Sequence, residues 1–139
     1  MRSIVPSRLL KQALAADALV SGSVAALQIA VPDTLSQLLL LPRGLLIETG
    51  VFLAAYALLL VVLSCSARLA SALVMIVVLG NLGWAAGCAL LLGTGFLAPS
   101  ALGLGFMLLQ VVAVVAFAGL EYIGLRASMP PAARAAVRT

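Results

Sequence analysis

The stretch Ala16-Asp17-Ala18-Leu19-Val20-Ser21-Gly22 places a carboxylate inside an apolar run that extends from about residue 9 to residue 30. At about 1.5 Å per residue, a helix of that length crosses the hydrocarbon core of a bilayer. An aspartate at that depth costs about 2.5–3.5 kcal/mol on insertion scales, so its side chain should face protein or water rather than lipid. The rest of the chain must therefore supply polar partners for Asp17.

The composition is that of a membrane protein. Of the 139 residues, 65% are hydrophobic and only 9% are charged, whereas a soluble domain has about 25% charged residues. The chain contains no histidine, which excludes histidine-ligated metals, histidine-ligated haem and a Ser-His-Asp triad. We therefore expect no metal, no cofactor and no enzymatic activity.

Three further apolar runs are long enough to span. With the first run they predict an all-α, integral membrane four-helix bundle with short loops, a single domain over residues 1–126, with helices at about 9–30, 45–63, 69–92 and 101–125. Pro32-Asp33-Thr34 gives a helix start ahead of residues 35–41, which are too few to span and predict a short helix at the interface or over the bundle mouth. Residues 127–139 predict a basic cytoplasmic tail that frays.

A cleaved signal peptide is the competing interpretation of the first run. Basic residues precede the run, and Val24-Ala25-Ala26 resembles a cleavage site. The run is longer than the usual core of roughly 7–15 residues and is interrupted by Asp17, so we favour a retained helix.

The basic residues predict the orientation. If the N-terminus is cytoplasmic, the outer side receives only Arg43, and the inner side receives Arg2, Arg8, Lys11, Arg68, Arg126, Arg134 and Arg138. The positive-inside rule then places both termini in the cytoplasm. The net charge of +4 comes with no basic stripe interleaved with aromatics, so membrane lipid is the expected partner and nucleic acid is not.

Five polar side chains fall near the middle of the predicted bilayer, on four different helices. They are Asp17, Ser21, Tyr56, Asn81 and Gln110. Their positions along the helices predict that they converge, because polar groups in lipid must find partners inside the bundle. The cluster is either interhelical adhesion, at about 0.6 kcal/mol per hydrogen bond, or a protonatable site with Asp17 as carrier. Adhesion is favoured, because no second acid is expected nearby.

The acids near the two membrane edges are interpreted as ion-pair anchors. Arg43 is the expected partner of Glu48 at the outer edge, and Arg126 or Arg68 that of Glu121 at the inner edge. Glu48 and Glu121 would then lie most of a membrane thickness apart. That separation argues against a two-carboxylate glycosidase mechanism, which needs about 5–9.5 Å.

Small residues give two weaker patterns. Gly83 and Gly87 form a small-xxx-small pair, which is typical of close helix approach. Ser21-Gly22-Ser23 and Ala86-Gly87-Cys88 give a faint internal echo, as two hairpin repeats would produce. Trp84 lies too deep for an aromatic belt and is expected to pack within the bundle.

Several short motifs occur together between about residues 9 and 126. They are Ala16-Asp17-Ala18 with Ser21-Gly22, Leu41-Pro42, Asn81-x-x-Trp84, Pro99-Ser100-Ala101-Leu102-Gly103, Gln110, and Glu121-Tyr122-Ile123-Gly124-Leu125-Arg126. In these motifs the chain resembles a family of short four-span bacterial inner-membrane proteins of unassigned function. The resemblance implies one domain in a bacterial inner membrane and no particular mechanism. The likeness to small multidrug transporters is one of architecture alone, because their acid in the first helix is a glutamate and their glycine-rich and tryptophan motifs are absent here.

Two classes of function follow from the sequence. The first is a small non-enzymatic integral membrane protein with a structural or accessory role, as a homo-oligomer or within a larger membrane complex. The alternative is a small oligomeric proton-coupled transporter or channel that uses Asp17. A wet cavity that reaches Asp17 would favour transport, and a dry, fully satisfied cluster would favour the structural role.

Overall fold

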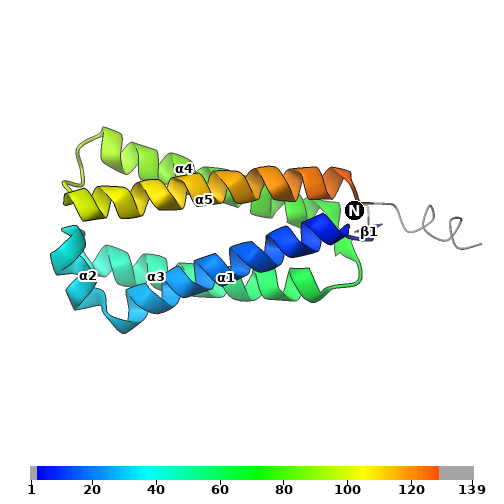
Figure 1. Ribbon diagram of the computed structural model, residues 1–139, viewed down its shortest axis with the longest axis horizontal. Helices are drawn as coiled ribbons and strands as arrows, with labels where there is room; N and C mark the ends of the chain where they lie inside the picture. Colours follow the sequence, from blue (N-terminus) through cyan, green and yellow to red (C-terminus); the bar gives the residue numbers. More distant parts are fainter. Residues whose placement is uncertain (1–2, 129–139) are drawn as a thin grey trace, which may run out of the picture.

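The computed structural model describes residues 3–128 and is almost entirely helical. Its elements are β1 (Ser3–Ile4), α1 (Arg8–Ala30), α2 (Pro32–Leu39), α3 (Arg43–Cys65), β2 (Leu69–Ala70), α4 (Ser71–Gly93) and α5 (Ala101–Arg126). The four long helices are each apolar enough to cross a membrane, and they lie roughly parallel to one axis (Figure 1). The predicted all-α four-helix bundle is confirmed, and the chain is a multi-pass membrane protein.

Local chemistry sets the helix ends. The hydroxyl of Ser7 accepts a hydrogen bond from the backbone N–H of Leu10 at 3.1 Å and caps α1, and Ser100 caps α5 in the same way. Pro32 occupies the first turn of α2, where its missing N–H costs nothing. Leu40, with φ 53°, ends that helix in the left-handed region. The short helix expected beside Pro32-Asp33-Thr34 is therefore present, and it lies at the end of the bundle opposite the N-terminus (Figure 1).

Two short strands were not predicted. Ser3 pairs with Ala70 and Ile4 with Leu69 in an antiparallel bridge. Consequently α4 begins at Ser71 rather than at residue 69. A strand of two residues is too short to show an alternating pattern, so hydrophobic periodicity could not reveal it. Most of the predicted tail, with Arg134 and Arg138, lies outside the described residues, as does Arg2.

The bundle consists of two hairpins that meet along one side. Helix α1 packs along α3, α4 packs along α5, and α1 also packs against α5. In Figure 1, α1 and α3 form one layer, and α4 and α5 form the other. Among these described helices, the backbones of α3 and α4 stay further apart, and these two helices meet through side chains. The molecule therefore has a closed seam between α1 and α5 and an open seam between α3 and α4.

The outward faces of the helices are apolar. Leu19, Leu58 and Leu109 are each about 70% exposed in the isolated chain, at 72%, 69% and 69%. Leucines at such exposure would be costly in water, whereas in a bilayer they contact lipid tails that are equally apolar. The inward faces carry the polar side chains described below.

Candidate functional site

Asp17 lies at the centre of a buried polar cluster. Its side chain is fully buried. The hydroxyl of Ser21 donates to Oδ1 at 2.8 Å, and the hydroxyl of Tyr56 and the amide nitrogen of Asn81 donate to Oδ2 at 3.1 and 2.9 Å. Because Tyr56 is on α3 and Asn81 is on α4, the fold supplies the interhelical partners that the sequence required.

Asn81 links a second acid to this cluster. Its amide nitrogen also donates to Oε2 of Glu121 on α5, at 3.2 Å. Its amide oxygen lies 3.1 Å from the hydroxyl of Tyr56. The single phenolic hydrogen can go to Asn81 or to Asp17, but not to both at once. The cluster therefore holds a hydrogen that can change acceptor without any movement of the backbone.

The sequence suggested that Glu121 is an ion-pair anchor at the membrane edge, and this prediction is wrong. It is fully buried, and one of its carboxylate oxygens, Oε1, has no hydrogen-bond partner. No salt bridge joins it to Arg126 or Arg68 in the described part of the chain. The guanidinium of Arg126 lies instead 6.0 Å from the centre of the Tyr122 ring. Glu121 is therefore a second acid beside Asp17, since both carboxylates accept from the amide nitrogen of Asn81.

Side-chain direction explains this error. Side chains tilt towards the N-terminus of their own helix. Asn81 on α4 therefore leans towards the end that carries the chain's N-terminus, and Glu121 on the antiparallel α5 leans the opposite way, so that they meet. Ala118 and Gly124, which are three residues before and after Glu121, are both buried. That spacing of small residues was the sequence signal that Glu121 faces the interior.

Gln110 stays outside the hydrogen-bonded cluster. No hydrogen bond to its amide is formed within residues 3–128. It lines a cavity of about 20 Å³ together with Asp17 and Ser21. A second cavity, of about 180 Å³, is lined by Ser21, Tyr56 and Asn81, among others. The smaller space is enough for roughly one water molecule, so the cluster is buried but adjoins space that water could enter.

The outer ion pair also differs from the one expected. The guanidinium of Arg43 donates to Asp33 at 2.6 Å, and both side chains are exposed. Glu48 is exposed and has no salt bridge within the described chain. Because Arg43 and Glu48 are five residues apart on α3, they point to different sides of the helix, whereas the turn after α2 brings Asp33 to Arg43.

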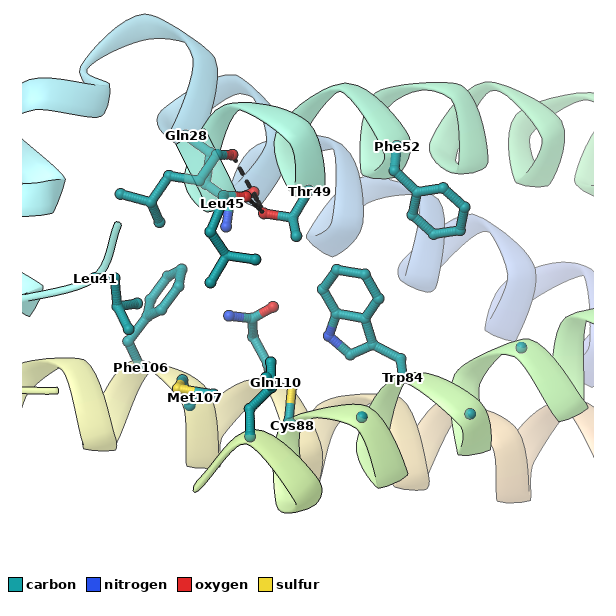
Figure 2. Close-up of a pocket in the computed structure, with 15 residues that line it drawn as sticks. Gln28, Leu41, Leu45, Thr49, Phe52, Trp84, Cys88, Phe106, Met107 and Gln110 are labelled. Carbon is teal, nitrogen blue, oxygen red and sulfur yellow. Dashed lines mark hydrogen bonds between the residues drawn. The ribbon is translucent and has the colours of Figure 1, made fainter. Parts of the chain in front are cut away.

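Aromatic side chains bridge the open seam at the level of the cluster. The Phe52 ring of α3 stacks on the Trp84 indole of α4 with a centroid distance of 5.9 Å and an interplanar angle of 5°. Phe52 also stacks on Tyr56, at 6.5 Å. Trp84 packs within the bundle, as its depth suggested. Phe52 and Trp84 line both the larger cavity drawn in Figure 2 and the cavity of about 180 Å³ that is bordered by Tyr56 and Asn81.

The chain matches no family model, no curated protein and no solved structure with which it was compared. The geometry of Asp17, Tyr56, Asn81 and Glu121 is therefore the basis for inferring its chemistry.

Proposed function

We propose that this chain is a small, non-enzymatic protein of the bacterial inner membrane that couples proton binding at the Asp17–Glu121 pair to transport. The observation that carries the proposal is the pair itself: two fully buried acids that receive hydrogen bonds from one amide group. The sequence favoured adhesion over transport because only one central acid was expected. The position of Glu121 removes that reason.

Charge repulsion supports a proton-binding role for the pair. Oδ2 of Asp17 and Oε2 of Glu121 accept from one nitrogen at 2.9 and 3.2 Å, so they lie at most about 6 Å apart. Even at that limit, two carboxylate charges repel by about 3 kcal/mol at an effective dielectric constant of 20. No basic side chain forms a salt bridge with either acid in the described residues. Two acids that share a site without a cation do not both ionise readily, and one of them holds a proton. Oε1 of Glu121, which accepts no hydrogen bond, is the oxygen available to carry that proton.

The unsatisfied oxygen also argues against adhesion as the sole role. A cluster that only joins helices is most stable when every buried polar atom has a partner. One unpartnered buried carboxylate oxygen lowers stability by about 1–3 kcal/mol. A proton-binding site tolerates that cost because the group must change its charge. The structural role remains the second candidate, and the donors from α1, α3 and α4 to Asp17 favour it.

The same proposal includes an orientation with both termini in the cytoplasm. The described basic residues at the end near the chain's N-terminus are Arg8, Lys11, Arg68 and Arg126, and Arg43 stands alone beside α2. This asymmetry follows the positive-inside rule. Assembly into a homo-oligomer would supply the transport path for which four helices leave little room.

Infrared difference spectroscopy across a pH titration tests the proton site without knowledge of the transported solute. The wild-type protein in lipid should show the carbonyl stretch of a buried protonated carboxylic acid, with a shift in D₂O. Glu121→Gln should lose this band, and Glu48→Gln, which changes an exposed acid on α3, should keep it. A band that survives in both Glu121→Gln and Asp17→Asn would overturn the proposal, as would its absence from the wild type.

Proton movement is the second readout. Proteoliposomes with an entrapped pH dye should show an imposed pH gradient collapsing faster with wild-type protein than with Asp17→Asn, since an amide cannot exchange a carboxyl proton. Circular dichroism and gel filtration should show that both proteins are folded. Equal rates for the two folded proteins would assign the cluster to the structural role.

A further inference from the structure

The open seam between α3 and α4 contains a large cavity. Its volume is about 480 Å³, within the range of about 300–1,000 Å³ for small-molecule sites. Side chains from α1, α3, α4 and α5 line it, and most of them are apolar (Figure 2). Since the backbones of α3 and α4 lie apart here, the cavity lies where a molecule dissolved in the bilayer could enter sideways.

Three glycines of α4 create the space. Gly80, Gly83 and Gly87 all line the cavity, and a Cβ atom on any of them would meet nothing within 4 Å. The close helix approach expected from Gly83 and Gly87 therefore does not occur among the described helices. An empty apolar space leaves its walls without dispersion contacts. The hollow is thus available to an apolar occupant.

Two side-chain amides limit what that occupant can be. Gln28 is only 2% exposed, and its oxygen lies 3.4 Å from the hydroxyl of Thr49. The amide nitrogen of Gln28 has no hydrogen-bond acceptor among the described residues. Gln110 points its amide into the cavity from α5, on the opposite wall (Figure 2). A ligand oxygen beside the Gln28 amide nitrogen would add a hydrogen bond worth about 0.5–1.5 kcal/mol.

The lining also determines the charge of the ligand. Among residues 3–128, no Asp, Glu, Lys or Arg lines the cavity. A charged head group would lose its hydration there without gaining a counter-ion. The Trp84 indole, held by its stacking on Phe52, presents a flat aromatic surface at one end of the space. These features together specify an apolar tail, an uncharged head and at least one acceptor oxygen.

We propose that this cavity binds one uncharged amphiphile from the bilayer, with a carbonyl oxygen of its head hydrogen-bonded to Gln28 and its tail between α3 and α4. The helix of a second copy fits the observations less well. A helix laid along the α4 glycines would present apolar side chains and leave the amide nitrogen of Gln28 without an acceptor. The proposal does not depend on proton binding at Asp17.

Trp84 is the only tryptophan in the chain, so its fluorescence reports occupancy of the cavity. The probe is a decyl-substituted benzoquinone, which is uncharged, carries carbonyl acceptors and quenches indole emission. Wild-type protein in nanodiscs should show saturable quenching above the linear background due to partition into lipid. Monodecanoylglycerol, an uncharged amphiphile with an ester carbonyl, should compete with the quinone. Decanoate at pH 8 should not.

Matched variants separate specific binding from partition. Gly83→Leu should fill the cavity and leave only the linear background. Gly119→Leu is the control, because Gly119 also has no atom within 4 Å of an added Cβ but lines no identified cavity. It should retain saturable quenching. If Gly83→Leu misfolds, Gly87→Leu makes the same test one turn along.

The amide contact has its own test. Gln28→Leu should weaken quinone binding about five- to tenfold, the value of one buried hydrogen bond. Thr49 keeps its bond to the carbonyl of Leu45 at 2.7 Å, so this change strands no group. Gln37→Leu, at an exposed position of α2, should leave the affinity unchanged.

Two results would overturn the proposal. Quenching that is equally linear in wild type and Gly83→Leu would show that the cavity takes no such ligand. A wild-type dimer that Gly83→Leu converts to monomers, with no saturable quenching in either form, would assign the seam to a second copy of the chain. Equal competition by decanoate and monodecanoylglycerol would overturn the requirement for an uncharged head.

Discussion

The two seams between the hairpins use similar residues in opposite ways. In the α1–α5 seam, Gly124 lies directly against the backbone of Leu10, and Asp17 and Glu121 are fully buried. In the α3–α4 seam, Gly83 faces open space, and the amide of Gln110 has no hydrogen-bond partner in the described chain. A glycine on a membrane helix thus marks either a close contact or a hollow. Which one it marks depends on the helix that lies opposite.

Gly124→Ala should break the closed seam and have the largest effect. An added Cβ would lie 2.7 Å from both the backbone nitrogen and the Cα of Leu10, and neither atom can move without shifting α1. Overpacking of this kind costs about 1–3 kcal/mol, and a backbone clash belongs at the upper end. We expect a loss of about 3 kcal/mol in the free energy of unfolding, measured in dodecyl maltoside–SDS mixtures. A loss below about 0.5 kcal/mol would show that the seam is loosely packed.

Asp17→Leu tests the polar part of the same seam. The change removes the acceptor used by Ser21, Tyr56 and Asn81, of which Asn81 retains Glu121 and Tyr56 retains the amide oxygen of Asn81. We expect a loss of about 2 kcal/mol, the cost of the lost hydrogen bonds and of the Ser21 hydroxyl left without this acceptor. Asp17→Asn keeps the shape and one acceptor oxygen, so its loss should be less than half as large. If unfolding is indifferent to Asp17→Leu, the cluster contributes nothing to adhesion between helices.

The closed seam was largely predictable from the sequence, except for its second acid. Apolar runs and helical spacing place Asp17, Ser21, Tyr56 and Asn81 at one depth on three helices, and lipid leaves such groups no other partners. Counting residues from the helix end placed Glu121 at the membrane edge. The count gave the depth of its Cα, whereas a long side chain that leans along the helix axis reaches a different depth.

The open seam could not be predicted. The spacing of Gly83 and Gly87 indicates a close helix contact. Nothing in that spacing shows that this face of α4 lines a cavity instead. Which helix faces meet depends on how well all four helix surfaces pack together, including the contact of Leu10 with Gly124. The sequence of one helix does not show this complementarity.

Tyr56→Phe tests the link between the seams. The Tyr56 hydroxyl lies 3.1 Å from both Asp17 and Asn81, and its ring stacks on Phe52. The phenylalanine keeps the ring and removes one hydrogen bond, so unfolding should be easier by about 1 kcal/mol. The infrared band should shift because Asp17 loses a donor. An unchanged band would show that Tyr56 does not contact the protonated pair in the membrane.

Gly83→Ala should have the smallest effect on folding, and with the opposite sign. The matched change at Gly124 forces a methyl group into the backbone of α1, whereas a methyl group at Gly83 meets nothing within 4 Å. Alanine also has the higher helix propensity, by about 1 kcal/mol in water, and hydrogen bonding within a membrane helix reduces that advantage. We therefore expect Gly83→Ala to stabilise the protein by about 0.5 kcal/mol in the same detergent titration, without a change in oligomeric state. Destabilisation by 1 kcal/mol or more would mean that α3, or a second copy of the chain, closes over α4 in the membrane. In that case the distinction between a closed and an open seam would be wrong.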